Sequence, residues 1–220
     1  MALQFQGNGG TIAEVDGTTF RAIRITPRPT DHGAFGHYRL STTVALVVTQ
    51  AANGSLFSFR WGDATRLCVP QKIRLQCLQT AVATATITCR FQVFIARAFT
   101  ASDSVGTAIT LTGNNMKKRT SMGTTLVTDI RKSAVAAGLT VGTRTLDAEP
   151  VLELSTQQTI TTLNQQLYSA DINFDSGDGV HPYVFAQNEG FIVRGPTIVF
   201  GAAGTADLTV DVAWAEVTAY

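Results

Sequence analysis

The sequence predicts an all-β fold: a single β-sandwich or jelly-roll-like domain with one short helix at about residues 124–137. Alternating apolar and polar residues, the pattern of half-buried strands, recur along the chain and are clearest over residues 64–98. Charged residues make up only 15% of the 220 residues, and Thr, Ala, Gly and Val dominate. Many short strand patterns separated by turn residues are typical of a sandwich or jelly roll, which at this length is commonly one domain.

The N-terminal part of the chain begins with a Gly-rich stretch over residues 1–18, which predicts a flexible arm. The sandwich domain is therefore expected over residues 19–220. Residues 19–26 alternate as a first strand, which Pro27 and Pro29 end.

Two strands and a hairpin turn are predicted next. Residues 37–49 become continuously apolar toward their end, as in a strand buried on both faces. The sequence AANG at residues 51–54 indicates a turn, so residues 55–61 are expected to return as the paired strand.

The clearest hairpin is expected within residues 64–98. Ile73, Leu75 and Cys77 alternate with polar residues, and the small residues 79–85 favour a turn, although they lack an Asn-Gly or Asp-Gly signal. The following strand places five apolar side chains on one face: Ile87, Cys89, Phe91, Val93 and Ile95. We expect the other strands to pair with this hairpin or to pack across it.

The predicted helix at residues 124–137 carries an apolar stripe that includes Leu126, Val127 and Ile130, and Gly138 is placed to end it. Short strands are expected again from residue 143 to the C-terminus.

Four aromatic residues, Phe57, Phe59, Trp61 and Trp214, have two interpretations. They are candidates for a carbohydrate platform, but their alternating positions favour the core.

Charge is unevenly placed along the chain. Residues 1–144 hold 16 Lys and Arg against 6 Asp and Glu, a net charge of +10, whereas residues 145–220 hold 1 against 10, a net charge of −9. This asymmetry predicts either a charged contact with other copies or a partner, or two halves that interleave in one sandwich and cancel in space.

Three cysteines, Cys68, Cys77 and Cys89, are an odd number without metal-site spacing, so buried free thiols are expected. The N-terminal residues do not resemble a signal peptide, and no apolar run reaches the length of a membrane span. We therefore expect folding in a cytoplasm, without a membrane and without a cofactor.

Basic residues supply the candidate partner-binding site: Lys117, Lys118 and Arg119, beside Arg131 and Lys132. No aromatic residue is interleaved with them and the chain is nearly neutral overall, which argues against nucleic acid. Contact with an acidic protein surface and a merely solvated loop remain the two interpretations.

The segment DINFDSGDGVHP contains a weak candidate for a metal site, formed by Asp171, Asp175 and Asp178 with His181. Its spacing is not that of an EF-hand loop, and a plain Asp- and Gly-rich turn is the favoured interpretation. No hydrolase, zinc-protease or nucleotide-binding motif is present, so the chain is expected not to be an enzyme.

Several blocks of the sequence resemble a group of structural proteins from the particles of tailed bacteriophages. They are FSFRWGDATRL (57–67), TGNNMKKRTSMGTTLVTDIR (112–131), TRTLDAEP (143–150), HPYVFAQNEGFIVR (181–194) and WAEVTAY (214–220). The likeness covers the chain from about residue 36 onward. It implies a virion protein, assembled in the cytoplasm of a bacterial host, that acts in many copies and without chemistry.

Within a phage particle the resemblance leaves several roles open. A capsid decoration or cement protein, packed on the major capsid protein as a homo-oligomer with a trimer favoured, fits the short, weakly charged chain. A tail or fibre component, including a receptor-binding tip, is the main alternative, and a small shell-forming jelly roll is a third. A glycan-cleaving sandwich enzyme would need two carboxylates placed across a groove.

Overall fold

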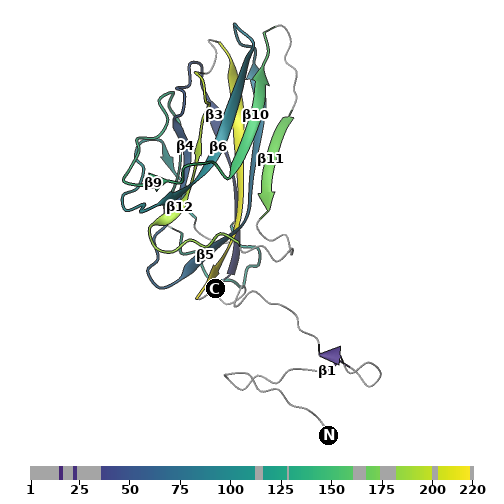
Figure 1. Ribbon diagram of the computed structural model, residues 1–220, viewed down its shortest axis with the longest axis vertical. Helices are drawn as coiled ribbons and strands as arrows, with labels where there is room; N and C mark the ends of the chain where they lie inside the picture. The colour runs from purple at the N-terminus through teal and green to yellow at the C-terminus, as the bar shows by residue number, and fades with distance from the viewer. Residues whose placement is uncertain are drawn as a thin grey trace.

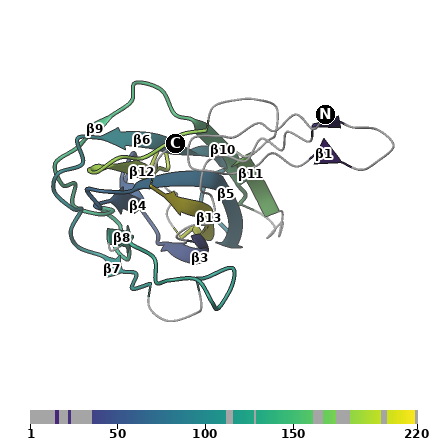
Figure 2. The ribbon, with the colours of Figure 1, turned by 90° about the horizontal axis from the view of Figure 1, so that it is seen from below.

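A computed structural model of the chain describes residues 15–16, 22–23, 36–111, 116–127, 129–160, 167–173, 182–199 and 203–218. The main body is built of long antiparallel strands that run along the longest axis of the molecule (Figure 1). The strands form two layers, which are seen from below in Figure 2. This confirms the predicted all-β sandwich. Near the N-terminus, β1 (Val15–Asp16) and β2 (Ala22–Ile23) pair with each other, and the rest of the predicted arm and first strand lies outside the described residues.

The first layer is a four-stranded sheet in the order β11-β5-β13-β3. Its strands are β3 (Gly36–Leu46), β5 (Leu67–Ala81), β11 (Leu167–Asn173) and β13 (Thr205–Val217). The second layer is a seven-stranded sheet in the order β10-β6-β12-β4-β8-β7, with β9 also paired to β6. Its strands are β4 (Ser55–Trp61), β6 (Ile87–Arg97), β7 (Thr107–Ala108), β8 (Asp129–Lys132), β9 (Thr145–Leu146), β10 (Leu152–Gln158) and β12 (Glu189–Arg194).

The eight longest strands make a jelly roll. Along the chain, successive long strands alternate between the two sheets, except that β6 and β10 lie side by side in the larger one. The insertion between β6 and β10 contributes the short strands β7, β8 and β9, and β8 pairs with the outer side of β4. This alternation is the double-sheet arrangement of jelly-roll proteins.

Both predicted hairpins are wrong in their pairing. The two strands of the clearest pattern, β5 and β6, lie in opposite sheets, and so do β3 and β4 on either side of the AANG turn. Alternation shows only that one face of a strand is buried. It does not show whether the next strand in the sequence pairs with it in the same sheet or packs against it from the other sheet. The connection over residues 82–86 spans the roughly 10 Å between packed sheets.

The predicted helix at residues 124–137 is also wrong: the described part of this segment forms β8 and turns. Ile130, expected on the helix stripe, is 2% exposed because it pairs opposite Phe59 in the sheet. An isolated helix of this length is marginal in water, so pairing with β4 outweighs its helical pattern. Gly138, expected to end the helix, instead has φ +82° and packs so closely on the Ser55 backbone that a side chain would clash.

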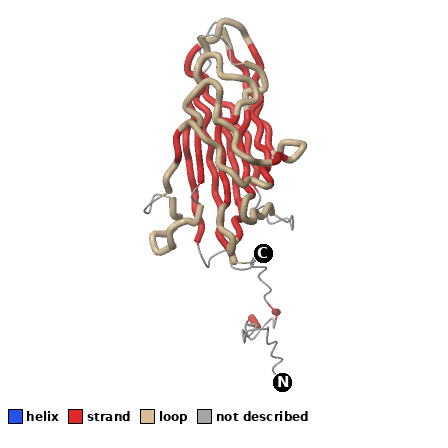
Figure 3. The backbone as a smooth tube through the Cα atoms, turned by 90° about the vertical axis from the view of Figure 1, so that its left-hand side faces the viewer, coloured by secondary structure: helices blue, strands red, loops and turns tan. Residues whose placement is uncertain are grey.

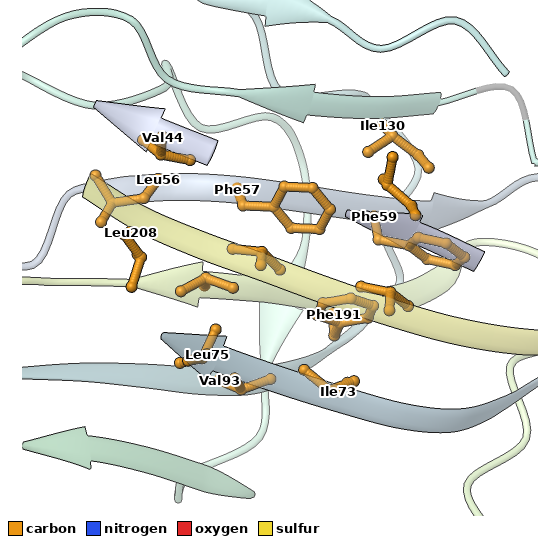
Figure 4. Packing of buried hydrophobic residues seen from close by; sticks show 14 of the residues in the cluster. Val44, Leu56, Phe57, Phe59, Ile73, Leu75, Val93, Ile130, Phe191 and Leu208 are labelled. Atoms are coloured by element: carbon orange, nitrogen blue, oxygen red, sulfur yellow. The ribbon is translucent and has the colours of Figure 1, made fainter. Parts of the chain in front are cut away.

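The core lies between the two sheets and is rich in aromatic side chains (Figure 4). Phe59 on β4 stacks on Phe191 at a ring distance of 5.2 Å, and meets Trp214 of the other sheet edge-on at 5.4 Å. Phe57, Phe59, Trp61 and Trp214 are all fully buried, so these residues form core and not an exposed platform. The three cysteines are buried and free, as predicted.

The two ends of the sandwich differ in what they hold. Four connections lie at one end of the sandwich: β3 to β4, β5 to β6, β10 to β11 and β12 to β13. In the four-stranded sheet, Leu46 pairs with Ala206 and Ala81 pairs with Thr205, so these strand ends lie together. In the seven-stranded sheet, Ile87 at the start of β6 pairs with Gln158 at the end of β10. The other end holds Gly36 and the C-terminal strand end at Val217. Figure 3 shows loops gathered at both ends of the strands, with the C-terminus at the lower one.

Candidate interaction surface

The basic loop predicted from the sequence lies against the free edge of β3. The backbone N–H of Arg39 donates to the Met116 carbonyl at 2.9 Å, and that of Lys118 donates to the His37 carbonyl at 3.0 Å. Lys117 thereby forms a β-bridge with Tyr38. These contacts fill edge positions that would otherwise be open to strand pairing.

Two basic side chains of this loop donate hydrogen bonds to neutral partners. Lys118 Nζ donates to Gln71 Oε1 at 3.1 Å, and Arg119 Nη2 donates to Ser121 Oγ at 3.3 Å. Lys118 and Arg119 are exposed, and Lys117 is half-buried. Within the part of the chain that the structure describes, no carboxylate forms an ion pair with these three positive charges.

Arg131 and Lys132 lie on β8 in the opposite sheet, not on a helix beside the loop. Lys132 connects the two sheets: its Nζ donates to the carbonyl of Thr43, on the edge strand β3 of the other sheet, at 3.0 Å. Arg131 is half-buried and pairs with Ser58. Along β3, the contacts of Lys132 and of the basic loop are four to six residues apart, about 13–20 Å.

The structure adds Arg39 to this set. It is exposed on β3, next to Met116 of the basic loop. Sequence reasoning did not include Arg39 in this set, because only the tertiary structure brings it to the loop. We call the six basic residues along β3 and β8 the basic edge: Arg39, Lys117, Lys118, Arg119, Arg131 and Lys132.

No ion pair in the described part of the chain involves the basic edge, although ion pairs are frequent elsewhere. Seven are found there: Arg60–Asp129, Lys72–Asp171, Arg74–Asp211, Arg90–Glu153, Arg97–Asp147, Arg97–Glu189 and Arg144–Asp103. Five of the seven join the basic first part of the chain to the acidic second part. Among the described residues the two halves thus interleave and largely cancel, and the basic edge is left without an ion pair.

A shallow hollow of about 480 Å³ borders the basic edge on the outer face of the four-stranded sheet. Arg39, Ser41 and Met116 line one part of it, and the Arg74–Asp211 ion pair lines another. In that pair Arg74 Nε donates to Asp211 Oδ2 at 2.7 Å. The hollow gives the basic edge a concave margin that a side chain of a partner could enter.

Of the weak candidates for a metal site at residues 171–181, only Asp171 lies among the described ligand residues. Asp171 is exposed on β11, where it lies 3.7 Å from Lys72 Nζ and pairs opposite Arg74. Asp175, Asp178 and His181 lie outside the described residues. Within the described ranges, no group of three or more His, Cys, Asp or Glu side chains is placed to hold a metal.

A buried carboxylate that sequence reasoning missed fixes the segment leading into β8. Glu216 Oε1 accepts hydrogen bonds from the Thr125 hydroxyl, from the Leu126 backbone N–H at 2.9 Å and from Trp214 Nε1 at 3.3 Å. Burial raises the pKa of Glu216 above its ordinary value, and the three donors oppose that shift. Its alternating position near the end of β13 resembles that of any strand carboxylate, so the sequence carries no signal for this role.

The cysteines are unsuited to nucleophilic chemistry. Burial raises the pKa of Cys77 to about 12 and that of Cys89 to about 11, and it raises the pKa of Cys68 as well. The thiolate is the reactive form of cysteine, so all three side chains are inert at neutral pH.

No helix in the described residues is long and apolar enough to cross a membrane. Comparisons with protein-family models and with curated proteins find no match to this chain.

Proposed function

We propose that this chain is a non-enzymatic structural protein of a bacteriophage particle, which decorates or cements the capsid by packing in many copies on the major capsid protein. The observation that carries the proposal is the basic edge, a set of six positive side chains without a carboxylate partner in the described residues. Complementary charge on a partner speeds association and fixes orientation. The expected contact is therefore an acidic surface of the shell.

The architecture supports a structural role for the same chain. Its core is continuous between two sheets, its thiols are inert, and five ion pairs tie its oppositely charged halves together. The resemblance of the sequence to phage structural proteins supplies the biological context. Jelly rolls are also the fold of many capsid proteins.

A triple substitution, Lys117→Ala with Lys118→Ala and Arg119→Ala, tests the proposal. We expect the variant to fold normally and to bind particles that lack this chain more weakly than the wild type does. Binding of the wild type should weaken as NaCl rises, and the variant should respond less to salt, because fewer charges are screened.

The matched control removes three positive charges that already have partners: Lys72→Ala with Arg90→Ala and Arg97→Ala. This control should bind particles as the wild type does. Equal weakening by both triple variants would show that net charge matters and the basic edge does not. Binding by the wild type that is independent of salt would refute a charged interface.

The number of copies per particle, measured by quantitative mass spectrometry against the major capsid protein, tests the location. A copy number close to that of the capsid protein is expected for decoration or cement. A handful of copies would place the chain in the tail or fibre instead, and absence from purified particles would refute the virion assignment.

A second role, a subunit that itself builds a shell, is favoured by one observation: the alternation of the eight long strands between the sheets is that of jelly-roll proteins, which include viral capsid subunits. Electron microscopy of the purified chain distinguishes the two roles. Closed shells formed by the chain alone would favour this second role, whereas a decoration protein needs the underlying capsid.

A further inference from the structure

One side of the β3 backbone is filled only along its first residues. β13 pairs along the whole of β3, which is the edge strand of its layer (Figure 2). On the side away from β13, Arg39 N–H donates to the Met116 carbonyl and the His37 carbonyl accepts from Lys118 N–H. The odd-numbered residues of β3 therefore direct their N–H and C=O groups away from β13, because this direction alternates along an antiparallel strand.

Beyond Arg39, the same side of β3 is open. The register with β13 is unbroken through the rest of the strand, so Ser41, Thr43 and Ala45 also direct their N–H groups away from the sheet. Among the described residues, none accepts a hydrogen bond from these three N–H groups, and the three side chains are exposed. We call residues 41–45 the open stretch of β3.

A single side chain occupies one backbone group of the open stretch. Lys132 Nζ, on β8 of the other sheet, donates to the Thr43 carbonyl at 3.0 Å. It stands where the N–H of an added strand would donate. A lysine side chain is long and flexible, so a backbone N–H can take its place while its charge stays beside the edge.

The charges of the basic edge, which flanks the open stretch, are all positive. If two copies paired β3 with β3, positive side chains would meet positive side chains whichever residues came opposite, and such charges deter edge pairing. Asp207 and Asp211 lie one strand further in, on β13, and Arg74 holds Asp211. A strand that carries carboxylates is instead attracted by the basic edge.

We propose that the open stretch of β3 binds an extended acidic segment of a partner protein, which adds a strand to the four-stranded sheet. This binding mode rests on the proposed function, because it names how the basic edge receives its acidic partner. The N–H groups of Ser41, Thr43 and Ala45 donate to carbonyls of the added strand, and its carboxylates meet the basic loop and Lys132. In strand addition, main-chain hydrogen bonds supply affinity and side chains supply specificity.

The spacing of the positive groups predicts the spacing of the carboxylates in the partner. The basic loop contacts β3 at His37 and Arg39, and Lys132 contacts it at Thr43, four to six residues away. An added strand advances by the same distance per residue as β3 does, so carboxylates four to six residues apart reach both groups. The hollow beside Arg39 and Ser41 lies on this path and admits a side chain of the added strand.

The probe for the test is a capped eight-residue peptide in which Thr and Glu alternate, so that it holds carboxylates at both spacings. We expect it to bind the purified chain at low salt with a Kd of about 1 mM or tighter, measured by NMR titration. The same peptide with Lys in place of Glu should not bind. No binding of the Glu peptide at about 10 mM would overturn the proposal.

Hydrogen exchange distinguishes strand addition from a contact through side chains alone. In the free chain, the N–H groups of Ser41, Thr43 and Ala45 should exchange rapidly, whereas those of Leu40 and Thr42, which point to β13, should exchange slowly. The Glu peptide should slow the three rapid groups about tenfold or more. Binding without this protection would overturn the proposal, and so would slow exchange in the free chain, which would show that another segment or a second copy already covers the stretch.

Thr43→Pro removes one outward N–H and no hydrogen bond to β13, and an edge strand tolerates proline at such a position. It should weaken binding of the Glu peptide about tenfold or more. Thr43→Val is the matched control: both variants lose the hydroxyl contact with Thr209, but valine keeps the N–H and should bind as the wild type does. Equal binding by the two variants would overturn the proposal. The exchange measurement needs no variant, so the test stands even where Thr43→Pro does not fold.

Binding to particles separates this binding mode from the proposed function. If the triple variant of Lys117, Lys118 and Arg119 loses binding to particles and Thr43→Pro keeps it, strand addition is refuted and the proposed function stands. If the Glu peptide protects the open stretch but the wild type does not bind particles, the proposed function is refuted and the acidic strand site stands.

Discussion

The buried ion pair between Arg144 and Asp103 is expected to determine whether the long insertion stays anchored to the sandwich. The two side chains are 2% and 0% exposed. Asp103 also accepts from the Gly142 N–H at 2.9 Å and from Ser55 Oγ at 3.2 Å, and the Arg144 guanidinium lies 5.1 Å from the centre of the Phe99 ring. The pair thus ties three parts of the insertion to the first residue of β4.

Asp103→Asn keeps the shape of the side chain but removes its charge, so the Arg144 guanidinium is left buried without a counter-ion. Breaking a buried pair in this way costs about 3–5 kcal/mol. That is a large fraction of the roughly 5–15 kcal/mol by which a domain is stable. Asp147→Asn is the matched control, because Asp147 is 38% exposed beside Arg97 and its change should cost about 1 kcal/mol or less.

Urea denaturation followed by the fluorescence of the two buried tryptophans, Trp61 and Trp214, measures both losses. Adding Arg144→Met to Asp103→Asn should restore most of the lost stability, since no buried charge then remains. Equal losses for Asp103→Asn and Asp147→Asn would refute the reasoning, and so would a double variant that is less stable than Asp103→Asn alone.

Two further predictions concern the core and pH. Phe91→Ala should lower the free energy of unfolding by about 3–5 kcal/mol, as for a fully buried aromatic ring, whereas Thr88→Ala on the exposed face of β6 should cost far less; a loss below about 1 kcal/mol for Phe91→Ala would contradict its burial. The folded-state pKa of Glu216 is raised above its ordinary value of 4.5, so the folded protein holds this proton more tightly than the unfolded chain does. Its contribution to stability should therefore fall as pH rises from about 4.5 through the raised pKa, and the difference between wild type and Glu216→Gln in urea titrations across that range should change with pH; a constant difference would contradict the raised pKa.

The sequence by itself determined the fold class and the buried face of the strands over residues 64–98. Ile73, Leu75 and Phe91 are each fully buried, as the alternation over residues 64–98 predicts. This works because side-chain direction along a strand has a period of two, which any partner arrangement must respect. The free cysteines and the outward position of the basic loop could be predicted for the same local reasons.

Pairing and charge balance were decided only by the tertiary structure. Whether β5 meets β6 beside it or across the core depends on every other strand, and residues 124–137 become a strand and turns because β4 offers an open edge and Glu216 holds Leu126. Likewise, only the fold sets Asp211 against Arg74 and leaves the basic edge without carboxylates. The period of two shows which face of its own strand a residue occupies. Strand pairing and ion pairs depend on residues far apart in the sequence, which no local pattern encodes.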